Sequence, residues 1–144
     1  MRPLTHDRGQ ELVEFALVAP ILFLLLFGLM EFGVAIWHYN TLAQAAREGA
    51  RAALVWADDY REDMARSAAI DYAQGVGIGV TNADVDYGDD WFIIADPVDE
   101  TAPKRYVPTV AVTITYRYEG ITGLAALLPS GGLTLQASSS MLVE

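Results

Sequence analysis

Glu14 is the residue whose chemistry most needs an explanation, because it is a carboxylate inside an apolar run. Residues 12 to 30 carry no other charge, and the run continues to Trp37 with Glu31 as its one further charged residue. An ionised carboxylate inside hydrocarbon costs several kcal/mol unless it has a partner. Glu14 is therefore expected either to pair with a positive group or to lie at the cytoplasmic surface of a membrane in contact with water.

A second group of carboxylates lies in the stretch NADVDYGDD. Calcium takes about 6 to 8 oxygen ligands, and acidic loops supply them. The EF-hand pattern is not met, because its glycine would fall at Tyr87 and the sequence has Gly88 one position later. We therefore expect a solvated acidic loop, with calcium binding as the alternative. The candidate ligands for that alternative are Asp84, Asp86, Asp89 and Asp90, preceded by Asn82.

Catalytic chemistry is not indicated by the residues present. The chain has no cysteine, and its two histidines, His6 and His38, both lie in the first 38 residues. A Ser/His/Asp arrangement or a zinc site in the later part of the chain would have no histidine to use. The glycine-rich GVGIGV lacks the spacing of a phosphate-binding loop. We expect a protein that is not an enzyme and needs no cofactor.

Composition divides the chain into an apolar first third and a polar remainder. Of the 144 residues, 53% are hydrophobic, and many of these stand before residue 38. Such a chain fits a membrane anchor followed by a domain of about 100 residues. The net charge is −10, with fourteen Asp or Glu against five Lys or Arg beyond residue 52. Nucleic acid is not expected as a partner, because phosphate binding needs a basic surface.

The apolar run is long enough to cross a membrane as a helix. About 20 apolar residues span a bilayer, and residues 10–37 supply that length. Arg2 and Arg8 precede the run, and no basic side chain of lysine or arginine follows it until Arg47. By the positive-inside rule the N-terminus stays in the cytoplasm and everything after about residue 38 lies outside. Trp37 would then stand in the outer headgroup layer.

The same helix is predicted to continue outside the membrane over residues 38–57. Nothing strongly breaks a helix there, and Pro20 in the apolar run is expected to kink the helix rather than end it. The continuation carries a stripe at spacings of three and four whose small residues let another backbone come close. Two interpretations are open: packing on this chain's own sheet, or packing against neighbouring subunits. The stripe consists of Leu42, Ala46, Gly49, Ala53, Trp56 and Tyr60.

The rest of the chain predicts a second helix and a small antiparallel sheet. Residues 58–75 have acidic residues in their first turn and end at a glycine, as helices often do. Within residues 76–144 the best strand is VPTVAVTITYRYEG, where apolar and polar residues alternate. LTLQASSSMLVE is its expected antiparallel neighbour, and short strands are expected at 83–87 and 91–95. The fold class is therefore α+β with a long N-terminal helix.

The residues around Glu14 resemble a known processing site. Glu14 is the fifth residue after Gly9 and Phe15 is the sixth, which is similar to the cut site of type IV prepilins of the tight-adherence class. GQELVEFALVAPILFLLLFGLMEFG together with YNTLAQAAREGARAA is similar to the TadE-like pseudopilin family. The resemblance covers roughly residues 8 to 57.

This resemblance implies a pilin-like fold and a part in a surface fibre. Residues 1–9 would be a cytoplasmic leader that a prepilin peptidase removes after Gly9, which leaves Gln10 as the new N-terminus. Glu14 and Phe15 would be the family's characteristic pair. The α-amine of Gln10, charged at neutral pH, would be the partner of Glu14 on the same or a neighbouring chain. The implied partners are the prepilin peptidase, other pilin or pseudopilin subunits, and membrane lipid.

Three roles for the whole chain are open at this stage. The first is a minor component or assembly factor of a tight-adherence fibre, held in the cytoplasmic membrane and released into the extracellular fibre after processing. The second is the main structural subunit of such a fibre. The third is an uncleaved single-pass protein whose exported domain binds a ligand or calcium. Glu31 is open in a similar way, as an interfacial residue or as a partner for Arg47 or Arg51 of a neighbouring chain.

Overall fold

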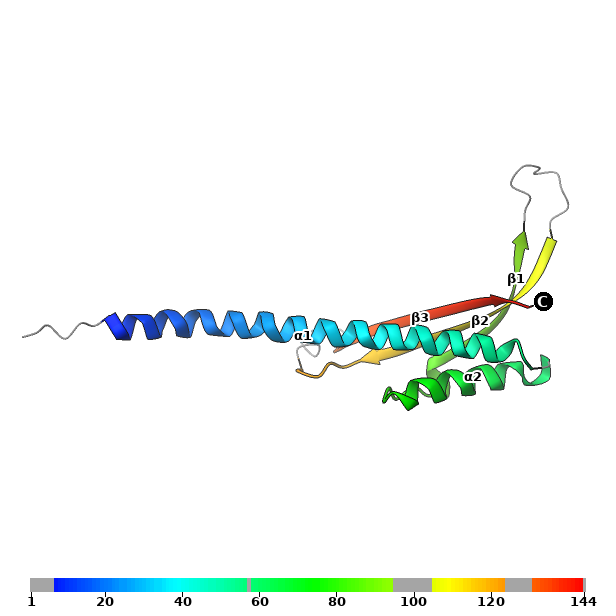
Figure 1. The fold of residues 1–144 in the computed structure, drawn as a ribbon, viewed down its shortest axis with the longest axis horizontal. Coiled ribbons are helices and arrows are strands. Elements are labelled where there is room, and N and C mark those ends of the chain that lie inside the picture. The colour runs from blue at the N-terminus through cyan, green and yellow to red at the C-terminus, as the bar shows by residue number, and fades with distance from the viewer. Residues whose placement is uncertain (1–6, 57, 95–104, 124–130, 144) are drawn as a thin grey trace, which may run out of the picture.

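The chain folds into a long helix that carries a small α+β domain on its second half, which confirms the predicted fold class (Figure 1). The structure is a computed structural model, and it describes residues 7–56, 58–94, 105–123 and 131–143. Its helices are α1 (Asp7–Ala53), α2 (Asp58–Gly75) and the short 3-10 helix η1 (Asn82–Asp84). Its strands are β1 (Val85–Ile94), β2 (Arg105–Tyr118) and β3 (Leu133–Leu142).

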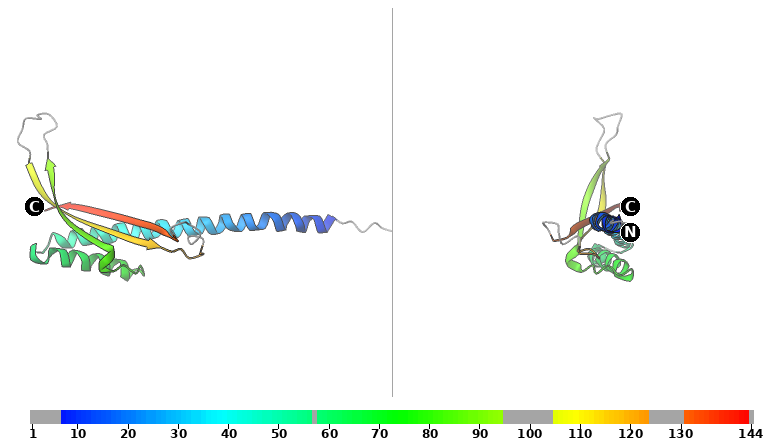
Figure 2. Two further views of the ribbon diagram at one scale, coloured as in Figure 1. Left: turned by 180° about the vertical axis from the view of Figure 1, so that it is seen from behind. Right: turned by 90° about the vertical axis from the view of Figure 1, so that its left-hand side faces the viewer.

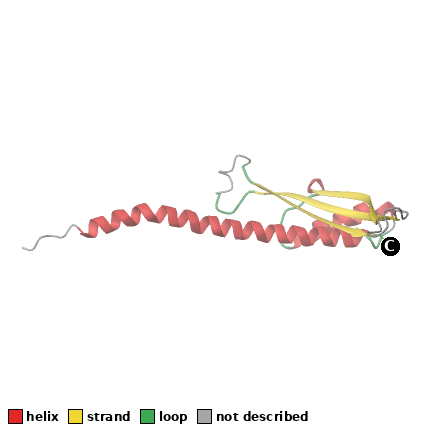
Figure 3. Cartoon of the chain, turned by 90° about the horizontal axis from the view of Figure 1, so that it is seen from above, coloured by secondary structure: helices red, strands yellow, loops and turns green. Residues whose placement is uncertain are grey.

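The helix α1 has 47 residues and is therefore about 70 Å long at about 1.5 Å per residue. Pro20 lies inside it without ending it, as the sequence predicts. The first half of α1 stands alone, whereas its second half is covered by α2 and by the sheet (Figures 1 and 3). One helix thus has two environments, and the change between them decides where its functional residues lie.

The helix α2 runs back along the second half of α1 (Figure 1). At the turn between them, the Arg61 Nε donates a hydrogen bond of 3.0 Å to the carbonyl of Ala53, the last residue of α1. Carbonyls at the end of a helix have no partner within the helix, so this arginine satisfies one of them. Its positive charge also interacts favourably with the negative end of the dipole of α1. The corner between the helices is therefore fixed by a side chain of α2.

The sheet has the strand order β1-β2-β3, and both pairs are antiparallel. The predicted pairing of the two best strands is confirmed, with Tyr118 opposite Leu133 and Thr109 opposite Leu142. The strands are staggered, so the last residues of β2 pair with β3 alone. The last residues of β1 and the first residues of β2 pair only with each other and project away from the helices as a ribbon (Figure 2).

The prediction of two short strands at 83–87 and 91–95 was wrong, because β1 is one continuous strand. Its residues from Val85 to Ile94 all pair with β2, and even Gly88 lies opposite Ala111. Glycine and aspartate in the middle of this segment are turn signals when read locally. The long partner strand supplies hydrogen bonds along the whole length and outweighs that local preference.

The core lies between the two helices and the sheet, and small residues form its helical side. Alanines at spacings of three and four on α1 and α2 let the two helix backbones approach closely. The larger fully buried side chains are Leu42 on α1, three residues on one face of β2, and three residues in the segment that leads into β1 and at its first position. The fully buried residues are Leu42, Ala45, Ala46, Ala50, Ala53, Ala65, Ala69, Ala73, Ile78, Val80, Val85, Val110, Val112 and Ile114.

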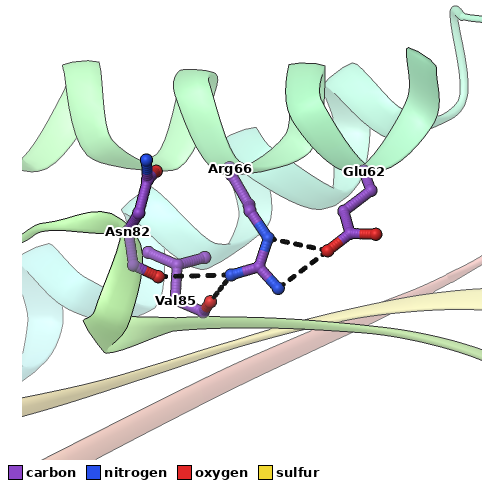
Figure 4. Close-up of polar contacts among 4 residues, drawn as sticks. All are labelled: Glu62, Arg66, Asn82 and Val85. Atoms are coloured by element: carbon purple, nitrogen blue, oxygen red, sulfur yellow. Dashed lines mark hydrogen bonds and ion pairs between the residues drawn. The ribbon is translucent and has the colours of Figure 1, made fainter.

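Arg66 ties α2 to the start of the sheet (Figure 4). Its guanidinium donates to the carbonyl of Asn82 at 3.2 Å and to the carbonyl of Val85. It also forms an ion pair of 2.9 Å with Glu62 one turn earlier on α2. One side chain therefore joins α2, η1 and the first residue of β1.

Replacing this arginine should loosen the domain. We expect Arg66→Met to lower the free energy of unfolding by about 2 kcal/mol, because two carbonyls lose a charged donor. The matched control is Glu62→Gln, which removes only a half-exposed ion pair and should cost less than about 1 kcal/mol. Urea denaturation of the full chain in detergent, followed by tryptophan fluorescence, measures both. Equal effects of the two variants would mean that the carbonyl contacts contribute nothing.

Candidate functional site

The first half of α1 is an apolar surface that no described part of the chain covers. Every large apolar side chain from Leu12 to Met30 is between 48% and 70% exposed. Soluble proteins rarely leave apolar patches of such extent in water. By its length and composition α1 can cross a membrane, and it is the one helix of the described residues that passes this test. The surface therefore fits lipid or the equivalent surface of other subunits.

The predicted processing residues all lie on this exposed part of α1. Gly9 has no atom within 4 Å of the place where a Cβ would stand, and Phe15 is 66% exposed. Gln10 Nε2 donates a hydrogen bond of 3.1 Å to Glu14 Oε1 one turn later. The bond between Gly9 and Gln10 lies in the first turn of α1, where a helix opens most easily, so a peptidase would have to unwind that turn alone.

The remainder of the predicted leader, residues 1–6, lies outside the described residues. The structure therefore brings Gly9, Gln10, Glu14 and Phe15 together on one helix. All four lie on the exposed first part of α1, away from the α+β domain on its second half.

Glu31 is held by the chain in a way that the sequence did not predict. Its carboxylate accepts hydrogen bonds from the backbone N–H of Ile121 at 3.0 Å and of Thr122 at 3.1 Å. It also accepts one from the Thr122 hydroxyl at 2.8 Å, and the residue is 9% exposed. We call this set of three hydrogen bonds the Glu31 clamp. Three donors within the chain therefore satisfy most of the hydrogen-bonding capacity of this carboxylate.

Two glycines shape the backbone of the clamp. Gly120 and Gly123 have φ of 84° and 77°, a left-handed conformation that is strained for other residues. Between them the chain turns two successive N–H groups toward one carboxylate, which is an arrangement suited to anions. The sequence signal for this site is the pair of glycines after the best strand. No residue pattern near these glycines indicates that Glu31 is the group they bind.

An aromatic cluster lies beside the clamp and fastens the same part of α1 to β2. The His38 ring is 5.8 Å from the ring of Tyr116 and 4.9 Å from that of Tyr118, measured between centroids. Tyr118 is buried, and burial together with the negative charge of Glu31 raises the pKa of its hydroxyl. The end of β2 is therefore joined to α1 by both polar and aromatic contacts.

The predicted small-residue stripe divides into two parts. Leu42, Ala46, Gly49 and Ala53 are buried against α2 and the sheet of the same chain. Trp56 and Tyr60 are 50% and 60% exposed beyond the corner of the helices. Packing within the chain therefore accounts for the first four residues, and the last two remain available for contacts.

Gly49 marks the closest approach in the stripe. A Cβ at this position would be 2.8 Å from the carbonyl oxygen of Ala65 and 3.0 Å from the Cβ of Ala69. Only glycine leaves room for the α2 backbone at this distance.

The acidic residues considered for calcium do not converge. Asp84 caps η1 by accepting hydrogen bonds from the N–H and hydroxyl of Thr81 at 2.8 and 2.7 Å. Asp89 accepts one of 2.6 Å from the Tyr87 hydroxyl, and burial and this contact raise the pKa of Tyr87. Asp86 is exposed, and the side chain of Asp90 lies outside the described residues. In the described part of the chain no three acidic or histidine side chains are grouped to hold a metal ion.

The fold and the exposed helix define a pilin-like protein, in which an apolar N-terminal helix carries an α+β domain. The family model described as TadE-like protein matches residues 9–51, which is nearly the whole of α1. The predicted resemblance to the TadE-like protein family is thereby confirmed over those residues. No curated protein and no solved structure was found to match the chain.

Proposed function

We propose that this chain is a pseudopilin that serves as a minor component or assembly factor of a tight-adherence surface fibre. In this proposal, α1 is inserted into the cytoplasmic membrane within residues 10–37, with its N-terminus inside, and a prepilin peptidase cuts after Gly9. The supporting observation is that the family match over 9–51 coincides with a helix that is an exposed apolar rod in its first half. In its second half that helix carries a folded domain.

Processing is the step to test first. The intact mass and N-terminal sequence of the protein from its native membrane or fibre fraction should give a chain that begins at Gln10. Gly9→Leu should block the cut and leave the fold unchanged, because no described atom lies within 4 Å of the added Cβ. A wild-type chain that still begins at Met1 in cells with an active peptidase would overturn the proposal. It would favour an uncleaved membrane-anchored protein.

Glu14 is expected to act in assembly rather than in cleavage. If its carboxylate pairs with the new α-amine of Gln10 in a low-dielectric setting, Glu14→Ala should leave cleavage largely intact. It should lower incorporation into fibres by roughly tenfold, the effect of about 1.4 kcal/mol. Quantitative immunoblotting of sheared fibres against the membrane fraction measures the ratio.

The chain offers a close control for this variant. Glu11→Ala removes the same charge three residues earlier on the same exposed helix, and it should leave incorporation unchanged. Equal incorporation of the Glu14 variant and the wild type would refute the pairing.

The number of copies of the chain in purified fibres separates the two fibre roles. Few copies of the chain per fibre would support a minor component, and a fibre made mostly of this chain would make it the main subunit.

A further inference from the structure

The environment of α1 changes at Glu31. From Leu12 to Met30 the large side chains are exposed on all sides of the helix. From Glu31 onward one side of the helix is covered, because Glu31, Ala35 and Leu42 are buried. Residues 12 to 30 extend about 28 Å at about 1.5 Å per residue, close to the ~30 Å thickness of the hydrocarbon core of a bilayer.

The Glu31 clamp fixes the height of the sheet relative to this boundary. Of the described residues outside α1, residues 119–123, which follow β2, reach farthest along α1 toward its N-terminal end (Figure 1). Their backbone is irregular, and lipid-exposed irregular backbone does not occur within hydrocarbon. They nevertheless contact Glu31, one residue beyond Met30. The headgroup layer is roughly 5 to 8 Å thick on each side. Residues that lie just beyond the edge of the hydrocarbon core would therefore lie within this layer.

The side chains at this height suit an interface between lipid and water. Ile121 is 61% exposed, although its own N–H is bound to Glu31, and Phe32 on α1 is 64% exposed. Glu119 is exposed on the same connection, so attraction to anionic lipid is not the cause of the contact. A contact of these side chains with the membrane would be apolar, and it should depend little on salt.

We propose that the end of the sheet that carries Ile121 rests in the headgroup layer of the outer leaflet that α1 crosses, with the Glu31 clamp holding it at the edge of the hydrocarbon. This inference rests on the proposed membrane anchoring. It adds a second lipid contact at Ile121, which lies 90 residues after Glu31 in the chain. The domain is thereby held close to the membrane and does not stand free of it on a bare helix.

Single-cysteine variants test the depth directly, because the chain contains no cysteine. The full chain is reconstituted in phosphatidylcholine vesicles with an environment-sensitive fluorophore at Ile121→Cys. Lipids that carry a nitroxide at the headgroup or deep in the acyl chain then act as quenchers. Leu24→Cys reports the middle of the span, and Ser138→Cys reports the exposed face of β3 farther from the membrane.

The label at position 121 should be quenched several-fold more by the headgroup nitroxide than the label at position 138. The label at 24 should be quenched by the deep nitroxide. Glu119→Cys, an exposed position two residues earlier, repeats the loop measurement if the first variant folds poorly. A quenched label at 24 with unquenched labels at 119 and 121 would overturn the inference and leave the anchoring intact. An unquenched label at 24 would overturn both.

Discussion

Gly49→Val is expected to separate α2 from α1 and to destabilise the domain by about 3 kcal/mol, near the upper end of the usual cost of overpacking. The added Cβ would stand 2.8 Å from a backbone carbonyl of α2 and 3.0 Å from the Ala69 Cβ. Neither neighbour is the end of a flexible side chain that can move aside. The contact can be relieved only by shifting a whole helix away from a closely packed layer of alanines.

The same substitution at Gly33 is the matched control. Gly33 lies on the same helix, is exposed, and has no atom within 4 Å of the place where a Cβ would stand. Gly33→Val should therefore leave the urea midpoint almost unchanged, whereas Gly49→Val should lower it strongly without changing the helix content of the folded protein measured by circular dichroism. If the two variants unfolded at the same urea concentration, the close approach of α2 to Gly49 would be refuted.

The elements of the fold could be predicted because their signals are local. An apolar run of membrane length, an acidic first turn within residues 58–75, and alternation along β2 each need only a short window of sequence. The exception is β1, where Gly88 and its acidic neighbours are turn signals. Pairing with β2 makes this segment one continuous strand, and such pairing depends on residues that are distant in the sequence.

The site could be predicted only where its residues are neighbours in the sequence. Gly9, Gln10, Glu14 and Phe15 form a motif within two turns of one helix, so their place on one short stretch of α1 follows from their spacing. The Glu31 clamp joins residues 90 positions apart, and it depends on the length of β2 and on the backbone of Gly120 and Gly123. No pattern near Glu31 contains that information.

The stripe from Leu42 to Tyr60 shows a different limit. Small residues at spacings of three and four indicate that another backbone comes close, but they do not say whether it belongs to the same chain. Here α2 and the sheet supply it for the first four residues, as the contact of Gly49 with Ala65 shows. The sequence pattern alone left both interpretations open.

Glu31→Ala is expected to release the end of the sheet from α1. Two backbone N–H groups and the Thr122 hydroxyl would lose a charged acceptor. The hydrogen bonds are partly accessible to water, so we expect a loss of about 3 kcal/mol in the free energy of unfolding rather than their full sum. Glu31→Gln keeps one acceptor oxygen, so its free energy of unfolding should lie between those of Glu31→Ala and the wild type. Glu48→Ala, which removes an exposed carboxylate from the same helix, should have little effect.

Hydrogen exchange shows whether the change is local. In Glu31→Ala the amides of Ile121 and Thr122 should lose their protection, while that of Val112 in the middle of β2 should be lowered only by the global loss of stability. The variant also removes the charge that interrupts the apolar run between Met30 and Trp37. The helix would then be free to sink further into the membrane, and a label at position 121 would lose its fixed depth. Unchanged protection at Ile121 and Thr122 would show that their hydrogen bonds do not depend on Glu31, and the clamp would then have no part in placing the domain.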